Sequence, residues 1–257
     1  MLPADGLTAT RPDGSTRPVD RPFAPEIPVA LEYNGLSYAV MMASPSDLED
    51  FVTGFALTEG LAGAVGDVVD IDLAETDKGW VARATITSLA VEQLQERVRT
   101  RVAESSCGLC GIDNLDVIAK PLPPVADHAP IAPAAIFKAL EGLREHQPGN
   151  RATGGMHAAA FVSADGDIVG VREDVGRHNA LDKLIGAMAR TNTPLAGGFI
   201  LSTARCSYEI VEKAVKAGAT TLVTISVPTS MAAARARSAG LSLFALARPD
   251  EILQVVP

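Results

Sequence analysis

Hydrophobic and polar residues alternate in two short stretches near the start of the chain, residues 29–33 and 36–42. Such alternation is typical of strands that have one buried face. The two stretches flank Asn34-Gly35, a dipeptide that tolerates the positive φ angles of a type I′ turn. The pattern therefore predicts a β-hairpin.

The spacing of apolar residues then changes from strand-like to helical. Ser44 and Asp47 form a box-like helix cap, and Pro45 suits a first helical turn. The apolar positions that recur at helical spacing are Leu48, Phe51, Val52 and Phe55. Later patterns predict strands at 68–73 and 80–87 and a helix at 91–103. We expect a small α+β domain here.

The region between residues 121 and 133 contains five prolines, a density that neither a helix nor a central strand tolerates. We interpret this region as a linker. Residues 1–26 carry few large apolar side chains and are interpreted as a flexible arm. The expected organisation is an arm (1–26), an α+β domain (27–120), a Pro-rich linker (121–133) and a second domain (134–257).

Helical and strand patterns alternate in the second domain. Helices are predicted at 134–146, 179–190, 208–217 and 230–239, and strands at 157–163, 167–171, 198–202, 221–226 and 241–247. Because parallel strands need helical crossovers, this order predicts an α/β fold, a three-layer sandwich with a mostly parallel sheet. Its ligand cleft should lie at the carboxyl ends of the strands, near Ser202, Ser226 and Ala247.

Composition and charge narrow the class of protein. The chain has 257 residues, of which 47% are hydrophobic, but no stretch approaches the ~18 consecutive apolar residues of a membrane span. The start also lacks the pattern of a signal peptide. A net charge of −9 opposes broad binding to nucleic acid or anionic membranes. We therefore expect a cytoplasmic protein that binds neither.

Two of the three cysteines, Cys107 and Cys110, lie within one turn of chain and are flanked by Gly108 and Gly111. A structural zinc site would need two further ligands, and a thioredoxin-like redox centre would follow the first strand of its fold rather than a helix. Cysteines that merely fill a turn would sit among apolar residues, whereas two serines precede this pair. The pattern favours sulfur transfer through a persulfide on an accessible thiol; zinc, redox and filler roles remain the alternatives.

A second set of polar residues lies at predicted strand ends and strand-to-helix turns of the second domain. Its members are His157, Arg172, Arg177, His178 and Arg205. Backbone N–H groups and the helix dipole favour anions at such turns, so the set indicates a phosphate-bearing ligand. The alternatives are a hydrogen-bonded core position for His157, a solvent-facing helix start for His178 and ordinary surface charges for the arginines. Cys206, in the same region, is interpreted as a small filler.

Several motifs accompany the Cys107-Gly-Leu-Cys110 pair. They are MMASPSDLEDF (41–51), GGMH (154–157), REDVGRHNALDK (172–183) and SYEIVEK (207–213). Together and in this order they resemble the formate dehydrogenase accessory sulfur-carrier family, FdhD, over residues 29–257. The resemblance implies a cytidine-deaminase-like three-layer α/β/α domain at the C-terminus, preceded by a smaller α+β domain, and a homodimer.

The resemblance also implies a function, that of a sulfurtransferase. Members of this family accept sulfur from a cysteine desulfurase as a cysteine persulfide. They pass it to the molybdenum bis(molybdopterin guanine dinucleotide) cofactor before that cofactor is inserted into formate dehydrogenase. The persulfide cysteine of the family falls on Cys107, and Cys110 would assist it.

The cofactor-binding residues implied by the resemblance lie at the end of the last predicted strand and directly after it. They are Leu246, Ala247, Arg248, Pro249, Asp250 and Glu251. We add His178 and Arg205 from the second set of polar residues as cofactor-binding candidates. Two alanines follow His157 where a deaminase would have its H-x-E signature, so we expect no bound metal. The alternative function is a non-catalytic chaperone that binds the cofactor and uses Cys-x-x-Cys to hold zinc or as a redox latch.

Overall fold

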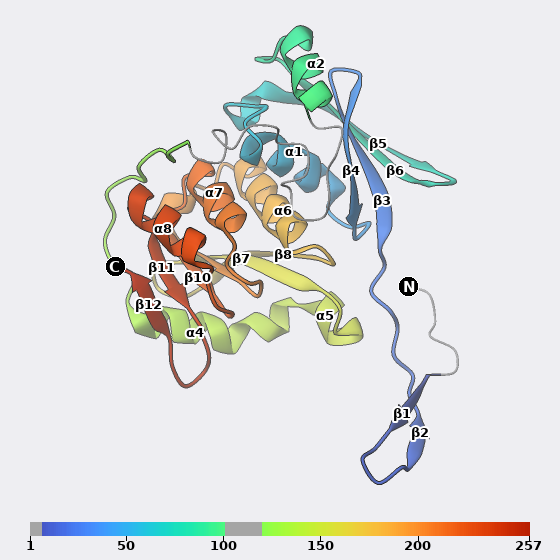
Figure 1. The fold of residues 1–257 in the computed structure, drawn as a ribbon, viewed down its shortest axis with the longest axis vertical. Helices are drawn as coiled ribbons and strands as arrows, with labels where there is room; N and C mark the ends of the chain where they lie inside the picture. Colours follow the sequence, from blue (N-terminus) through green and yellow to red (C-terminus); the bar gives the residue numbers. More distant parts are fainter. Residues whose placement is uncertain (1–6, 101–119) are drawn as a thin grey trace.

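The computed structural model describes residues 7–100 and 120–257, which form an arm, an N-terminal unit and a larger C-terminal unit (Figure 1). The arm begins with an antiparallel hairpin of β1 (Thr8–Thr10) and β2 (Thr16–Pro18) that projects from the body. The segment after this hairpin packs on Gly154 and Gly155, where added Cβ atoms would lie 1.8 Å from Arg21 Nη2 and 3.3 Å from Ala24 Cβ. These two glycines therefore make room for the arm.

The N-terminal unit is a four-stranded sheet in the order β4-β3-β6-β5, with α1 packed on it. Its elements are β3 (Ile27–Tyr33), β4 (Leu36–Ala43), α1 (Leu48–Thr58), η1 (Val65–Asp67), β5 (Val68–Thr76), β6 (Gly79–Ile86) and α2 (Val91–Thr100). The predicted hairpin is confirmed, because β3 and β4 pair across Asn34 (φ 49°) and Gly35 (φ 77°). The predicted cap is wrong: α1 begins after Asp47, and no side chain caps it.

The C-terminal unit is built on a six-stranded sheet in the order β12-β11-β10-β9-β7-β8. The strands are β7 (His157–Ser163), β8 (Ile168–Asp174), β9 (Gly198–Ser202), β10 (Thr221–Thr224), β11 (Ser242–Ala245) and β12 (Leu253–Val256). The pairs β9–β10 and β10–β11 are parallel, whereas β7–β8, β7–β9 and β11–β12 are antiparallel. The sheet is thus mixed rather than mostly parallel.

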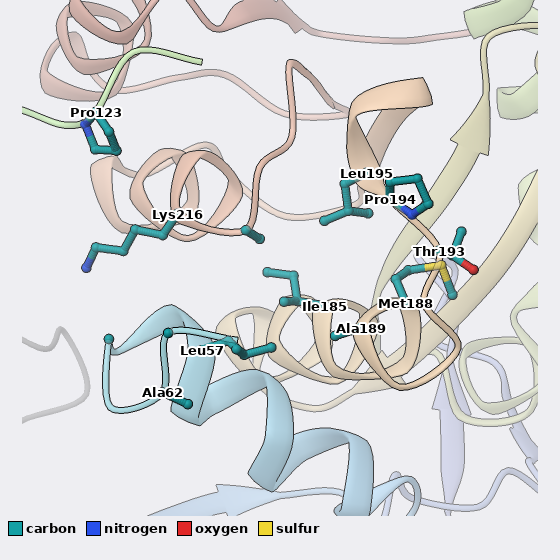
Figure 2. Close-up of a pocket in the computed structure, with 13 residues that line it drawn as sticks. Leu57, Ala62, Pro123, Ile185, Met188, Ala189, Thr193, Pro194, Leu195 and Lys216 are labelled. Atoms are coloured by element: carbon teal, nitrogen blue, oxygen red, sulfur yellow. The ribbon is translucent and has the colours of Figure 1, made fainter. Parts of the chain in front are cut away.

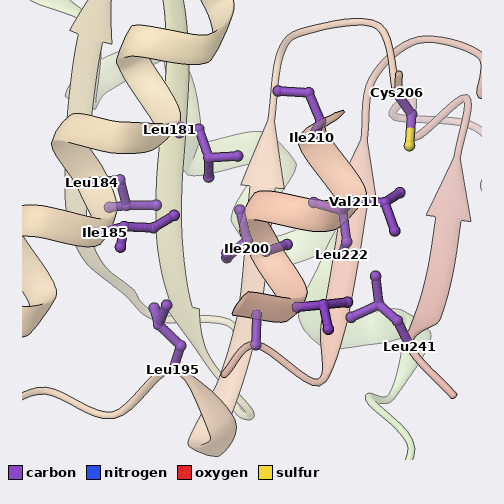
Figure 3. Close-up of a cluster of buried hydrophobic side chains, with 14 of the residues drawn as sticks. Leu181, Leu184, Ile185, Leu195, Ile200, Cys206, Ile210, Val211, Leu222 and Leu241 are labelled. Atoms are coloured by element: carbon purple, nitrogen blue, oxygen red, sulfur yellow. The ribbon is translucent and has the colours of Figure 1, made fainter. Parts of the chain in front are cut away.

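Helices cover both faces of this sheet, which gives the expected three layers. They are α4 (Pro133–Leu143), η2 (Arg144–His146), α5 (Pro148–Thr153), α6 (Arg177–Arg190), η3 (Leu195–Gly197), α7 (Tyr208–Lys216) and α8 (Ser230–Ala239). Successive strand residues point to opposite faces: Ile200 packs under α6, α7 and α8 (Figure 3), and Leu201 packs against α4.

The two units share α1, which lies between the N-terminal sheet and α6 (Figure 1). Two glycines, Gly54 and Gly186, allow the backbones of α1 and α6 to touch. The segment before α4 runs beside α8, where Val125 N donates to Ala239 O at 2.9 Å. Within residues 7–100 and 120–257, no helix has the length and apolar character that crossing a bilayer requires.

Candidate functional site

One edge of the C-terminal sheet gathers most of the polar residues that the sequence singles out. Strands β9, β10 and β11 run in the same direction, and β8 joins them because two antiparallel steps through β7 restore that direction. The carboxyl ends of these four strands and the start of β7 therefore meet at one edge, which we call the carboxyl edge. The strand ends expected at Ser202, Ser226 and Ala247 do lie at this edge, although β10 and β11 end two residues earlier than expected, at Thr224 and Ala245.

At the carboxyl edge, His178 in the first turn of α6 contacts Glu209 in the first turn of α7. His178 Nε2 lies 3.2 Å from Glu209 Oε2, and both side chains are less than a fifth exposed. Ser207 Oγ donates to the same Glu209 oxygen at 3.1 Å. Burial alone would raise the pKa of Glu209, but the contacts with His178 and Ser207 and the charge of Arg177 hold it below its ordinary value. The carboxylate therefore stays ionised beside the imidazole, although His178 Nε2 lacks a hydrogen bond of good geometry in the described part of the chain.

His157, the first residue of β7, lies in the field of the same cluster. Its pKa is lowered from 6.5, first by burial and then by the positive charge of Arg177 and His178, while Asp174 acts in the opposite direction. His157 is therefore an uncharged imidazole at neutral pH. Arg177 Nε is buried and has no hydrogen-bond partner in the described part of the chain.

The turn after β11 forms another wall of the carboxyl edge. Leu246 has a positive φ of 47° and donates its N–H to Ser226 O at 3.2 Å, and Ala247 N donates to Thr224 O at 3.1 Å. Ala247 is buried in the core against α4, so its side chain is not available to a ligand. The next four residues of this turn are exposed: Arg248, Pro249, Asp250 and Glu251.

The loop between β9 and α7 is tied to the loop after β10. Cys206 N donates to Val227 O at 3.2 Å, and Thr229 N donates to Cys206 O at 3.0 Å. The Cys206 side chain is fully buried in the hydrophobic cluster that includes Ile210 and Val211 of α7 (Figure 3), and burial raises its pKa to about 12. The interpretation of Cys206 as a filler is confirmed. Its neighbour Arg205 is exposed.

Three arginines thus lie at the carboxyl edge, at the starts of α6 and α7 and after β11: Arg177, Arg205 and Arg248. Among the described residues, none of the three forms an ion pair with a carboxylate. In a chain with a net charge of −9, cations without a partner at strand ends suit an anionic ligand. Asp250 and Glu251 are the acidic residues nearest in sequence to Arg248. Their negative charges weaken the positive electrostatic field at Arg248.

Two residues of the motif REDVGRHNALDK have structural partners instead. Arg172, a candidate phosphate ligand, donates to Asp50 of α1 at 2.8 Å and lies 3.5 Å from Asp47. These carboxylates give Arg172 a structural role in the contact between β8 and α1. Glu173 accepts from Gly149 N at 2.8 Å and Asn150 N at 2.7 Å, and so caps α5.

Cys107 and Cys110 lie outside the described residues. The sequence patterns did not single out Glu209, the residue that lies beside His178. Its position at the start of a helix that follows a strand end could have indicated a place at the carboxyl edge. Among the described residues, no group of three or more His, Cys, Asp or Glu side chains is placed to hold a metal ion.

Two cavities lie away from the carboxyl edge. One, of about 460 Å³, lies where the last turns of α1, α6 and α7 meet, and apolar side chains such as Leu57, Ile185 and Leu195 line much of it (Figure 2). The other, of about 300 Å³, lies at the start of α1 beside Trp80 and Arg190. Neither is lined by a candidate ligand-binding residue of the carboxyl edge.

The fold and the edge define a two-unit α/β protein with a cluster of arginine side chains at its strand ends. The model of the FdhD/NarQ family matches residues 24–255, and the chain belongs to that family. The resemblance noted from the sequence motifs is therefore confirmed.

Curated relatives match nearly the whole chain. The "Sulfur carrier protein FdhD" of Variovorax paradoxus is 41% identical over 230 residues, which cover 90% of this chain and 83% of the relative. The protein of the same name from Burkholderia mallei is 43% identical over 245 residues, which cover 93% and 89%. A crystal structure of a candidate formate dehydrogenase accessory protein from Desulfotalea psychrophila has a TM-score of 0.75 at 23% identity, covers 98% of this chain and 95% of its own, and shows the same fold.

Proposed function

We propose that this protein is a cytoplasmic sulfur carrier required for formate dehydrogenase activity. It takes sulfur from a cysteine desulfurase as a persulfide on Cys107 and delivers it to the molybdenum bis(molybdopterin guanine dinucleotide) cofactor. The observation that carries the proposal is the identity of at least 41% to two proteins named sulfur carrier, over 90% or more of this chain.

The carboxyl edge supports the proposal because its chemistry suits the phosphate groups of this cofactor. The buried Nε of Arg177 without a hydrogen-bond partner in the described chain and the exposed Arg205 and Arg248 are donors that a diphosphate would satisfy. We assign the cofactor to this edge, in a domain of cytidine-deaminase-like type. The backbone of Leu246 and Ala247, already tied to the loop after β10, would keep the turn in place.

The proposed chemistry has two steps. The Cys107 thiolate attacks the terminal sulfur of the desulfurase persulfide, so that a new S–S bond forms on Cys107 and the desulfurase thiolate leaves. The Cys110 thiol then attacks the inner sulfur of the Cys107 persulfide anion. This releases hydrosulfide to the acceptor and leaves a Cys107–Cys110 disulfide, which a cellular dithiol reduces for the next cycle.

Intact mass spectrometry tests the first step. After incubation with a cysteine desulfurase and cysteine, we expect an adduct of one sulfur atom that disappears with a thiol reductant. The adduct should be absent from Cys107→Ala and retained in Cys206→Ala, the matched control for a buried thiol. An unmodified wild-type chain, or an adduct that persists in Cys107→Ala, would reject the proposal.

Calorimetric titration with GDP tests the carboxyl edge. We expect binding that raises the melting temperature by linkage and that is weakened in Arg205→Ala and Arg248→Ala. Arg83→Ala is the control, because Arg83 is also exposed but pairs with Glu32 on the N-terminal sheet. Equal affinity in all four proteins would remove the edge from the proposal. Sedimentation separately checks whether this chain forms the expected homodimer.

The alternative is a non-catalytic chaperone that uses Cys-x-x-Cys to hold zinc or as a redox latch. One zinc ion per freshly purified chain, lost in Cys107→Ala and Cys110→Ala, would favour it. Full formate dehydrogenase activity in cells that carry only Cys107→Ala would favour it too.

A further inference from the structure

Two buried Lys–Asp pairs lie along the contact between the N-terminal and C-terminal units. The first joins Lys183 to Asp174 with 2.6 Å between Nζ and Oδ2, and both side chains are wholly buried. The second joins Lys213 to Asp182 at 2.9 Å. Each lysine also lies over an aromatic ring of α1, at 5.7 Å from Phe51 and 5.3 Å from Phe55 in the two pairs. The pairs are chemically alike, but only the first contains a residue of the carboxyl edge.

Asp174 is the last residue of β8, and its carboxylate receives four hydrogen bonds. Oδ2 accepts from Lys183 Nζ at 2.6 Å and from the N–H of Ser44 at 2.9 Å. Oδ1 accepts from the N–H of Gly176 at 2.7 Å and from Asn179 Nδ2 at 3.0 Å. Gly176 and Asn179 flank Arg177 and His178, so the carboxylate holds the backbone before these two ligand candidates and a side chain after them.

The same network ties that turn to the end of β4 in the N-terminal unit. Lys183 Nζ donates to Ser44 O at 2.9 Å, and Val175 N donates to Ser44 Oγ at 3.2 Å. Asn179 Nδ2 also donates to Met42 O at 2.8 Å. Every polar atom of Ser44 therefore has a partner at the end of β8, in the turn that follows it or in α6.

A buried ion pair contributes little net stability compared with apolar side chains of similar size, because both charges must be desolvated. Such a pair is better suited to fixing one geometry than to holding two units together. Here the geometry that it fixes is the start of α6. From there Arg177 and His178 lower the pKa values of His157 and Glu209.

We propose that Asp174, neutralised by Lys183 and joined to Ser44, is a positioning residue for the anion site of the carboxyl edge. It fixes the positions of Arg177 and His178 through its hydrogen bonds with the N–H of Gly176 and the side-chain amide of Asn179. It also makes the site depend on the docked N-terminal unit, whose chain continues to the Cys-x-x-Cys motif. This inference rests on the proposed function, and it assigns the geometry of the site to a residue that would not touch the ligand.

The matched pairs provide the test. The double variant Asp174→Asn/Lys183→Met removes the first pair without leaving a lone buried charge, and Asp182→Asn/Lys213→Met does the same to the second. In the full chain we expect GDP affinity to fall about tenfold, the loss of one well-placed charged contact, in the first variant only. The proposal would be overturned if both variants bound GDP as tightly as the wild-type protein, or if both lost the same affinity.

NMR titration of His157 gives a readout that loss of stability alone would not move. The Asp174 charge itself raises the pKa of His157, so the titration uses Asn179→Ala, which keeps that charge and removes the amide that Asp174 holds. Release of Arg177 and His178 from their places should bring the pKa of His157 back toward its ordinary value in this variant, whereas Asp182→Asn/Lys213→Met should leave it lowered. If the first variant does not fold, Ser44→Ala, which removes only the acceptor of Val175 N, should weaken GDP binding without lowering the melting temperature; unchanged binding would overturn the proposal. If wild-type protein does not bind GDP, the ligand assignment fails, and the His157 titration alone decides the positioning role.

Discussion

Gly54 of α1 and Gly186 of α6 lie directly against each other. A Cβ on Gly186 would lie 2.8 Å from Gly54 N and 1.9 Å from Asp50 O, and a Cβ on Gly54 would lie 1.8 Å from Asp182 O. The two helices therefore touch through their backbones, and this contact brings the ion pairs of Asp174 and Asp182 within reach of α1. The relation between the two units depends on these two missing side chains.

Gly186→Ala is expected to separate α1 from α6. Atoms that meet the new methyl group belong to backbone, which cannot turn away as a side chain can, so we expect a loss of at least about 1–3 kcal/mol, the usual cost of overpacking. Urea unfolding of the variant measures it. Gly197→Ala is the control, because a Cβ there meets nothing within 4 Å; equal stability of the two variants would contradict the prediction.

Local patterns were enough to predict most of the elements. Strands β7 (His157–Ser163) and β9 (Gly198–Ser202) and helix α8 (Ser230–Ala239) have the bounds expected from the sequence, because apolar periodicity and turn residues are short-range signals. Strand β12 (Leu253–Val256) was missed, since its four residues pair only at the sheet edge and two of them are exposed. The antiparallel order of β7 against β9 could not be read from alternation alone.

The sequence patterns could not predict contacts between residues that lie far apart in the sequence. Ser44 was interpreted as a helix cap but binds Asp174, and Arg172 was interpreted as a ligand contact but binds Asp50. In both cases the residue type was read correctly as one that needs a polar partner. Which partner it finds depends on how α1 docks on α6, and no local pattern contains that information.

Glu173→Gln tests whether this acidic residue is structural. The carboxylate accepts from two N–H groups at the start of α5, so we expect a loss of about 1–2 kcal/mol, as for other helix caps, with unchanged GDP affinity. Thermal unfolding and calorimetry measure the two effects. Glu145→Gln serves for comparison because its pair with Arg151 is exposed and should contribute little. Loss of GDP binding in Glu173→Gln would show a ligand role instead.

Cys206 is expected to be inert in the folded protein. Its thiol is fully buried and its pKa is about 12, so almost no thiolate forms at mildly alkaline pH. Alkylation with iodoacetamide followed by peptide mapping should label Cys206 only after denaturation. Labelling of this residue in native protein at a rate near that of free cysteine would contradict its assignment to the core.

His157 is expected to make stability fall in mild acid. Its pKa in the folded protein is below the ordinary 6.5, so protons bind the unfolded chain more readily. The stabilising contribution of the neutral imidazole is therefore complete above pH 6.5 and declines as the pH falls from there through the folded-state value. Urea unfolding across this range should show the decline, and His157→Gln, which cannot titrate, should show less of it.

An anionic ligand at the carboxyl edge should reverse the shift. The charges of Arg177 and His178 lower the pKa of His157, and a bound diphosphate would offset them. GDP should therefore raise the pKa of His157 in an NMR titration, and by linkage GDP should bind more tightly as the pH falls through that region, with uptake of protons. Calorimetry in buffers of different ionisation enthalpy measures the uptake. GDP that binds with no change in the His157 titration would place its phosphates away from this cluster.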